Sequence, residues 1–129
     1  MYIEHVAIWT NRLERMREFY EKYFQANAGS KYQNAAQQFE SYFLSFSSGA
    51  RLELMSRPAI SEIINDAEEQ ITGNTHVSFA CGSEENVDQL TDRIHKDGYQ
   101  VMDGPRHTGD GYYESVVLDP DGNRVEITG

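Results

Sequence analysis

The chain has 129 residues, enough for one domain with a hydrophobic core. Its formal net charge of −10 disfavours nucleic acid and anionic membranes as partners. The only cysteine is Cys81, so no intrachain disulfide can form, and no apolar run reaches membrane-spanning length. No signal peptide is recognisable. We therefore expect a cytoplasmic protein whose partner is a small-molecule substrate rather than nucleic acid or a membrane.

The chain opens with a predicted strand over residues 3–9, whose alternation places His5, Ala7 and Trp9 on one face. Thr10 or Asn11 can cap the helix that follows. An apolar stripe at helical spacing defines that helix: Leu13, Met16, Phe19, Tyr20, Tyr23 and Phe24.

Beyond Gly29, strands are expected at residues 30–33 and 39–46, with a loop at 34–36. A turn at Gly49 then leads into the strand Arg51-Leu52-Glu53-Leu54, which ends at Arg57-Pro58. This half therefore reads as strand, helix and three strands. Residues 59–74 are acidic and predict a connector with a short helix.

The second half repeats this order. A strand is predicted at residues 75–81, with His76 and Ser78 on one face, followed by a helix capped by Ser83 and ended by Gly98. Strands are predicted at residues 99–102 and 112–118, with a Gly-rich loop at 103–111 between them. The last strand, residues 123–128, follows the turn Asp119-Pro120-Asp121-Gly122.

The two halves match in their details. In both, a turn glycine is followed by any residue, Arg, a branched apolar residue, Glu and another apolar residue. Glu126 lies 73 residues after Glu53, and His76 lies 71 residues after His5. We expect an α+β fold of two tandem βαβββ modules, about residues 1–57 and 75–129, with curved, mixed sheets and helices on the outer face. Together they form a single domain over residues 1–129.

The recurrence singles out His5, Glu53, His76 and Glu126. Each lies on the strand face opposite the apolar residues that pack under a helix. Two imidazoles and two carboxylates suit a divalent ion such as Zn²⁺, Ni²⁺, Co²⁺, Mn²⁺ or Fe²⁺. Taken singly, a strand histidine is usually structural and a strand glutamate is usually solvated. The matched recurrence favours a metal site.

The order βαβββ, the strand His-Val-Ala-Ile and the closing Asp-Pro-Asp-Gly-Asn-Arg-Val-Glu-Ile resemble the vicinal oxygen chelate superfamily (glyoxalase–bleomycin resistance–dioxygenase). The four-residue set most resembles that of the glyoxalase I (lactoylglutathione lyase) enzymes. The resemblance implies one divalent ion (Zn, Ni, Co or Mn) held by these four residues, in a homodimer whose sites combine ligands from both chains. It also implies that the enzyme stabilises an enediolate, with Glu126 as the catalytic base.

Two positions depart from the glutathione-binding pattern. Bacterial-type glyoxalase I enzymes commonly have Arg four residues after the first His, where this chain has Trp9, and Asn four residues after the first Glu, where it has Arg57. Trp9 and Arg57 are therefore candidate substrate-binding residues, although cavity lining and a solvated strand end explain them equally well. Arg106, in a loop that either covers a ligand or is plain surface, and Tyr113 complete this set.

The sequence thus predicts a metal-dependent lyase or isomerase of the glyoxalase I type, acting on a small substrate with vicinal oxygens. Another activity of the same superfamily, an epimerase or a dioxygenase, keeps the metal and changes the reaction. A drug-binding resistance protein is the non-enzymatic alternative. Because Trp9 cannot replace an arginine, we expect the hemithioacetal of methylglyoxal and glutathione to be a poor substrate.

Overall fold

The computed structural model describes residues 1–61, 73–74 and 76–129. These fall into two compact units, one within residues 1–63 and one within residues 64–129, and each is described by itself. Most of the predicted connector, including its short helix, lies outside the described residues. In the part of the chain that is described, no helix is long and apolar enough to cross a membrane.

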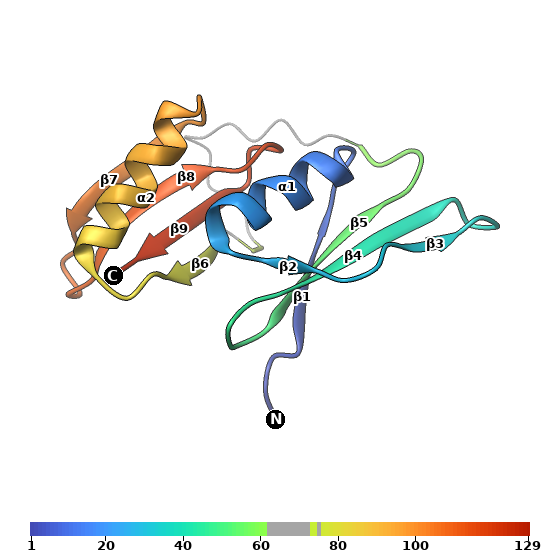
Figure 1. The fold of residues 1–129 in the computed structure, drawn as a ribbon, viewed down its shortest axis with the longest axis horizontal. Helices are drawn as coiled ribbons and strands as arrows, with labels where there is room; N and C mark the ends of the chain where they lie inside the picture. Colours follow the sequence, from blue (N-terminus) through green and yellow to red (C-terminus); the bar gives the residue numbers. More distant parts are fainter. Residues whose placement is uncertain (62–72, 75) are drawn as a thin grey trace. The chain divides into compact units, whose positions relative to one another are not determined.

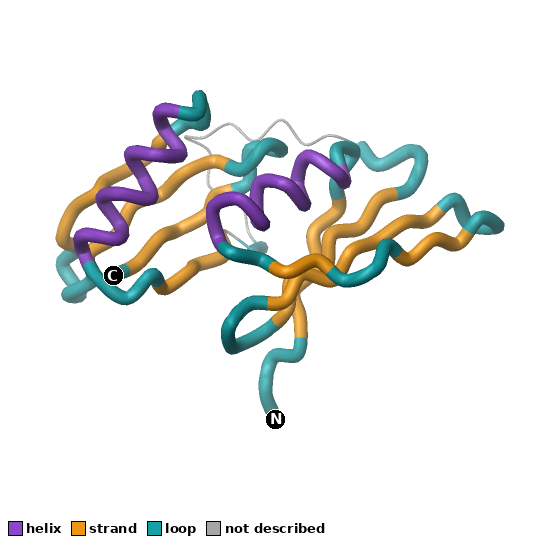
Figure 2. The backbone as a smooth tube through the Cα atoms, in the orientation of Figure 1, coloured by secondary structure: helices purple, strands orange, loops and turns teal. Residues whose placement is uncertain are grey.

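The first unit is a mixed sheet with one helix (Figure 1, Figure 2). The strand order is β1-β5-β4-β2, with β3 also paired to β4; β1 and β5 are parallel, and β4 is antiparallel to its three partners β2, β3 and β5. Helix α1 buries its predicted apolar stripe against the sheet, next to Leu44, Leu52 and Leu54. The elements are β1 (His5–Trp9), α1 (Leu13–Phe24), β2 (Asn27–Ala28), β3 (Tyr32–Asn34), β4 (Phe39–Ser45) and β5 (Arg51–Ser56).

Two local predictions for this unit need correction. The single strand expected at residues 30–33 is divided into β2 and β3, both of which pair with β4. The helix is preceded by Arg12, which makes no side-chain capping bond, rather than capped by Asn11. Thr10 instead holds the turn before the helix, because its hydroxyl oxygen accepts the backbone N–H of Arg12 at 2.8 Å.

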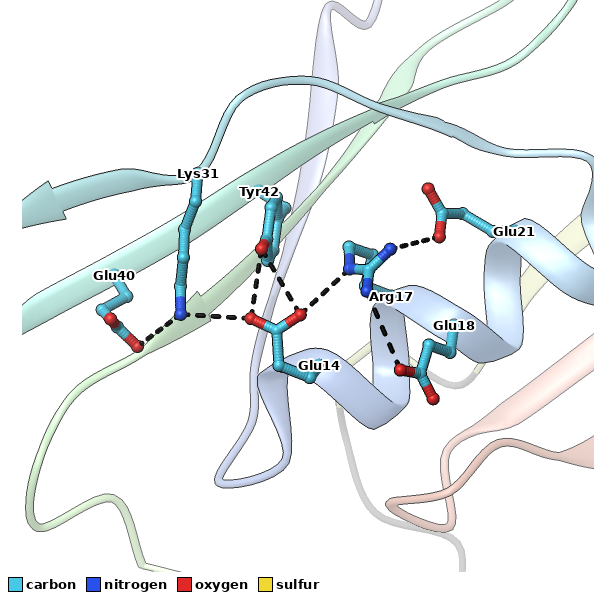
Figure 3. Close-up of polar contacts among 7 residues, drawn as sticks. All are labelled: Glu14, Arg17, Glu18, Glu21, Lys31, Glu40 and Tyr42. Carbon is cyan, nitrogen blue, oxygen red and sulfur yellow. Dashed lines mark hydrogen bonds and ion pairs between the residues drawn. The ribbon is translucent and has the colours of Figure 1, made fainter.

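Charged side chains on the helix side of the first unit join α1 to β3 and β4 (Figure 3). The Glu14 carboxylate accepts from Arg17 at 3.1 Å, from Lys31 at 3.1 Å and from the Tyr42 hydroxyl at 3.1 Å. Lys31 also contacts Glu40 at 3.1 Å. This brace network, defined here as Glu14, Arg17, Lys31, Glu40 and Tyr42, ties the segment entering β3 to both elements.

The second unit has the strand order β6-β9-β8-β7, with β6 and β9 parallel and the other neighbours antiparallel (Figure 1). Ser83 caps α2 as predicted, accepting the N–H of Asn86 at 3.2 Å. The core lies between α2 and the sheet and includes Val87, Ile94, Val117, Val125 and Ile127. The elements are β6 (His76–Ala80), α2 (Glu84–Lys96), β7 (Val101–His107), β8 (Tyr113–Leu118) and β9 (Arg124–Thr128).

The Gly-rich loop predicted at residues 103–111 is shorter than expected, because β7 continues to His107. The strand follows β8 through two register irregularities. Gly104 is required there: it has φ of +74°, and a Cβ at this position would lie 2.4 Å from the Glu114 carbonyl oxygen. Sequence rules treat Gly and Pro as strand breakers, and for that reason the prediction ended this strand at Met102.

The turn before β9 is held by a buried aspartate. Asp119 is 4% exposed, and its Oδ1 accepts the backbone N–H groups of Asp121 and Asn123, each at 2.9 Å. Gly122 takes φ of +81°, which an L side chain rarely adopts. These bonds fix where β9 begins and therefore where Glu126 stands.

Candidate metal centre

The first half-site is the pair His5 and Glu53. Val6 on β1 is paired with Leu52 on β5, and this register places Glu53 opposite Ala7, one step along the same face from His5. His5 Nε2 lies 3.9 Å from Glu53 Oε2. The imidazole is 41% exposed and the carboxylate 14%, so the pair is open to solvent on the imidazole side.

Glu4 sets the proton arrangement of His5. Its carboxylate contacts His5 Nδ1 and also the guanidinium of Arg51. A carboxylate can only accept, so Nδ1 carries the hydrogen of this contact, and in the neutral imidazole the lone pair is then on Nε2, on the Glu53 side. The hydrogen bond from His5 and then Arg51 hold the pKa of Glu4 below its ordinary value, against desolvation. Metal-bound histidines are commonly oriented in this way by a carboxylate.

The second half-site is the pair His76 and Glu126, in the same register: Ser78 opposes Glu126, as Ala7 opposes Glu53. His76 Nε2 lies 3.6 Å from Glu126 Oε2, with exposures of 44% and 16%. The Ser78 hydroxyl donates to Glu126 Oε1 at 2.7 Å. One carboxylate oxygen is thus held by the strand neighbour while the other faces the imidazole.

Both half-sites fit a divalent ion. Nitrogen and oxygen ligands about 2.1 Å from a tetrahedral ion lie about 3.4 Å from each other, close to the 3.6 and 3.9 Å found here. Each half-site supplies two donors, whereas protein zinc sites use three or four. Within the described ranges, no group of three or more His, Cys, Asp or Glu side chains is arranged to hold an ion. One half-site alone is therefore an incomplete centre.

The face that carries the first half-site continues into an aromatic row. Trp9 opposes Met55, Met55 opposes Ser41, and Ser41 opposes Tyr32, so these side chains cross the sheet in line. Phe39 adds its ring beside Trp9. The Arg57 guanidinium lies 4.9 Å from the centre of the Trp9 indole. The structure thus brings both predicted substrate-binding residues of this half, Trp9 and Arg57, to the side of the sheet that bears His5 and Glu53.

A family model for the Glyoxalase/Bleomycin resistance protein/Dioxygenase superfamily matches residues 2–127. The chain belongs to this superfamily. A possible glyoxalase from Bacillus cereus is 29% identical, with a TM-score of 0.74 over 100% of this chain and 99% of that one.

More distant superfamily structures share the fold. The trypanothione-dependent glyoxalase I of Leishmania major is 19% identical, with a TM-score of 0.77 over 100% of this chain and 86% of that one. Lactoylglutathione lyase from Agrobacterium tumefaciens is 20% identical, with a TM-score of 0.67 over 98% and 91%. Among curated proteins, the uncharacterized protein YqjT of Bacillus subtilis (strain 168) is 38% identical over 58 residues, which is 43% of this chain and 45% of YqjT. The match thus spans less than half of that relative.

The other two predicted substrate-binding residues of this superfamily member are placed differently. Arg106 opposes Glu114, which is on the face of Glu126, but its guanidinium is paired with Asp103 at 2.5 Å. Tyr113 lies on the helix side, in phase with the buried Ser115, and its hydroxyl donates to Asp88 on α2 at 2.7 Å. The structure does not bring Tyr113 to the face of Glu126.

Sequence reasoning missed Glu4 and Glu114. Glu4 precedes His5 directly, and strand alternation assigns neighbours to opposite faces, so the pattern argues against their contact. Glu114 could have been found from strand alternation. Ser115 and Val117 are the buried positions of β8, so Glu114 and Val116 lie on the opposite face. Burial raises the pKa of Glu114, and the nearby charge of Glu126 raises it further.

Proposed function

We propose that this protein is a metal-dependent lyase or isomerase of the glyoxalase I type, acting on a small substrate with vicinal oxygens. The observation that carries this proposal is the repetition of one His–Glu pair at the same register in both sheets. A structural histidine has no reason to recur beside a half-buried carboxylate in both units. Membership of the superfamily and the likeness to glyoxalases support the same reaction class.

We assign His5, Glu53, His76 and Glu126 as the ligands of one Zn²⁺, Ni²⁺, Co²⁺ or Mn²⁺ ion. Two half-sites, one of each kind, supply the four donors that such an ion takes from protein. When bound, the ion supplies Lewis-acid stabilisation of the negative charge that develops on substrate oxygen. With its Nδ1 directed to Glu4, the neutral imidazole of His5 presents Nε2 as the metal ligand.

Glu126 is the proposed base. It takes a proton from the substrate carbon next to the oxygens and returns it to the neighbouring carbon, so the reaction is an isomerisation with no net change in protons. The Ser78 hydroxyl on Oε1 holds the carboxylate in place and leaves Oε2 to face the reacting side. Glu53 has Ala7 at the matching position and receives no such bond, which supports Glu126 rather than Glu53 in this role.

The metal assignment is tested by elemental analysis of protein purified without chelator. We expect about one ion per chain, and its loss in His76→Ala. His95→Ala is the matched control, because His95 is an exposed histidine on α2 outside either half-site. Chelator should lower the melting temperature of wild type if the ion binds only the folded state. Wild type that binds none of the four metals after reconstitution contradicts the proposal.

We further propose a homodimer in which each centre takes its two half-sites from different chains. Mixing two defective variants, Glu53→Gln and Glu126→Gln, tests this. In such a dimer, the mixed species carries one doubly damaged centre and one intact centre, so random mixing restores about a quarter of wild-type metal capacity. If both half-sites come from the same chain, mixing restores nothing.

The substrate expectation is tested with the hemithioacetal of methylglyoxal and glutathione. We expect poor turnover, because Trp9 cannot make a charge-assisted bond to a glutathione carboxylate. A metal-loaded sample with kcat/KM of about 10⁶ M⁻¹s⁻¹ or more on this compound would identify an ordinary glyoxalase I and reject this expectation. The metal and base assignments would survive that result.

A further inference from the structure

Resting on the function proposed above, we propose that the first unit selects a substrate bearing an aromatic ring and, beyond the ring, a carboxylate. The residues that would bind it are Trp9, Phe39, Tyr32 and Arg57, which we call the ring-and-anion site. All four belong to one compact unit and share the side of the sheet with His5 and Glu53.

Arg57 is the anion-binding group of this site. Its guanidinium carbon lies 4.9 Å from the Trp9 ring centre, so the cation lies over the indole. A cation–π contact uses the charge of the guanidinium rather than its N–H donors, and those donors match a carboxylate with two parallel hydrogen bonds. Among the described residues, no carboxylate lies within ion-pair distance of Arg57. Arg51, on the same face, is different: it covers Phe43 and is already paired with Glu4.

Three aromatic rings, of which Trp9 contacts Arg57, form the surface for the substrate's ring. Phe39 meets Trp9 edge-on at 6.1 Å and meets Tyr32 at 6.0 Å with a 60° tilt. Trp9 is 42% exposed and Tyr32 is 55% exposed, so ring surface remains open to a ligand. Aromatic rings in proteins prefer such offset and edge-to-face partners, and a flat ligand ring extends the same arrangement.

The spacing along the strands sets the length of the substrate. Trp9 comes four residues after His5, and Arg57 comes four residues after Glu53. Four residues of strand span about 13 Å. At the backbone, the ring-and-anion site is therefore well separated from the metal ligands. A ligand with vicinal oxygens at one end, a ring in the middle and a carboxylate at the other end matches that separation better than a two- or three-carbon acid.

Three stable acids of increasing length test the site: lactate, mandelate and 4-carboxymandelate. All have the same hydroxy-acid head, mandelate adds the ring, and 4-carboxymandelate adds the remote carboxylate. Trp9 is the only tryptophan, so its fluorescence reports directly on ligands that reach the site. With metal-loaded protein we expect affinity to rise along the series, by about tenfold or more at the last step.

Variants separate the two parts of the proposal. Arg57→Gln should abolish the gain from mandelate to 4-carboxymandelate, and Tyr32→Ala should reduce the gain from lactate to mandelate. Arg15→Gln and Tyr112→Ala are matched controls: Arg15 is an exposed arginine on α1, and Tyr112 is as exposed as Tyr32. An unchanged affinity ratio in Arg57→Gln, or equal affinities for the three acids in protein that holds its metal, overturns the proposal.

The same titration in chelator distinguishes this proposal from the metal assignment. A Trp9 response to 4-carboxymandelate that persists in chelator and is lost in Arg57→Gln supports the ring-and-anion site even if the protein binds no metal. Protein that binds metal normally but shows no Trp9 response to any of the acids rejects the ring-and-anion site alone.

Discussion

The two half-sites share their metal-binding positions and differ in the residues around them. Ala7 in the first unit corresponds to Ser78 in the second, and Trp9 corresponds to Ala80. Farther along the same row, Met55 and Ser41 correspond to Thr128 and Glu114. At these four positions the first unit is apolar or aromatic except at Ser41, and the second carries hydroxyl and carboxylate groups except at Ala80.

This difference shows how a duplicated scaffold divides its tasks. The register that places His and Glu together is fixed by parallel pairing of the first and last strands in each module, so both copies retain it. The neighbouring rows carry no such constraint. In our proposal the first unit uses them to bind the body of the substrate, while the second uses them to position a carboxylate that moves a proton.

The largest expected effect comes from replacing the metal-binding glutamate of each half-site in turn, Glu53 in the first unit and Glu126 in the second. Both Glu53→Gln and Glu126→Gln should weaken metal binding, because each loses an anionic ligand. At saturating metal, Glu126→Gln should still lower kcat by about 10² or more, since the amide cannot accept the proton, whereas Glu53→Gln should recover much of its turnover. Steady-state kinetics across a metal titration measure both effects on a substrate that the wild type converts.

Asp92→Asn serves as the control, because Asp92 is an exposed helix residue paired only with Lys96 among the contacts described for it. Equal and unrecoverable losses in the two glutamate variants would show that the half-sites are functionally equivalent. The assignment of Glu126 as base would then be wrong.

Repetition explains why so much of this architecture could be predicted. The apolar stripe of α1, the Ser83 cap and Gly98 stop of α2 and the alternation of β9 are local signals, and each recovered its element to within a residue or two. The limits predicted for the strands at residues 30–33 and 99–102 are wrong. The observed limits of β3 are set by its pairing with β4, and those of β7 by its pairing with β8, and the local sequence does not reveal such pairing.

Within the site, alternation predicted that Trp9 shares the face of His5, but not that the Arg57 guanidinium lies over the Trp9 ring. Contacts that break the alternation rule, such as Glu4 with its own neighbour His5, are invisible to a pattern with period two. Side-chain pairing of this kind requires coordinates.

A smaller effect is expected from Glu4→Gln, which tests the role of that contact. The amide keeps the shape but loses the charge that favours the Nδ1–H tautomer of His5, so metal affinity should fall by about tenfold. Nitrogen chemical shifts of the His5 ring should move toward a mixture of tautomers. Glu18→Gln, at an exposed glutamate on α1, is the control. Unchanged ring shifts with unchanged metal affinity would show that Glu4 only pairs with Arg51.

The smallest expected effect concerns the brace network. It lies on the helix side of the first sheet and holds β3, whose Tyr32 belongs to the ring-and-anion site on the opposite face. Lys31 and Glu40 hold the start of β3 on the helix side (Figure 3). Tyr32 follows Lys31 and lies on the other face, opposite Ser41. Burial opposes ionisation of Glu14, but bonds from Lys31, Arg17 and Tyr42 hold its pKa below the ordinary 4.5. Gln33 and Lys31 do the same for Glu40.

A carboxylate whose pKa is lower in the folded state stabilises the fold fully above its unfolded pKa and loses that contribution as pH falls through the folded pKa. The double variant Glu14→Gln, Glu40→Gln should therefore lower the free energy of unfolding near pH 7 by about 1 kcal/mol, a small value because both groups are partly exposed and screened by solvent. Below about pH 4 the difference from wild type should shrink. Urea unfolding at pH 7 and pH 3 measures both values. A constant difference at the two pH values would mean that packing, not charge, holds β3 in place.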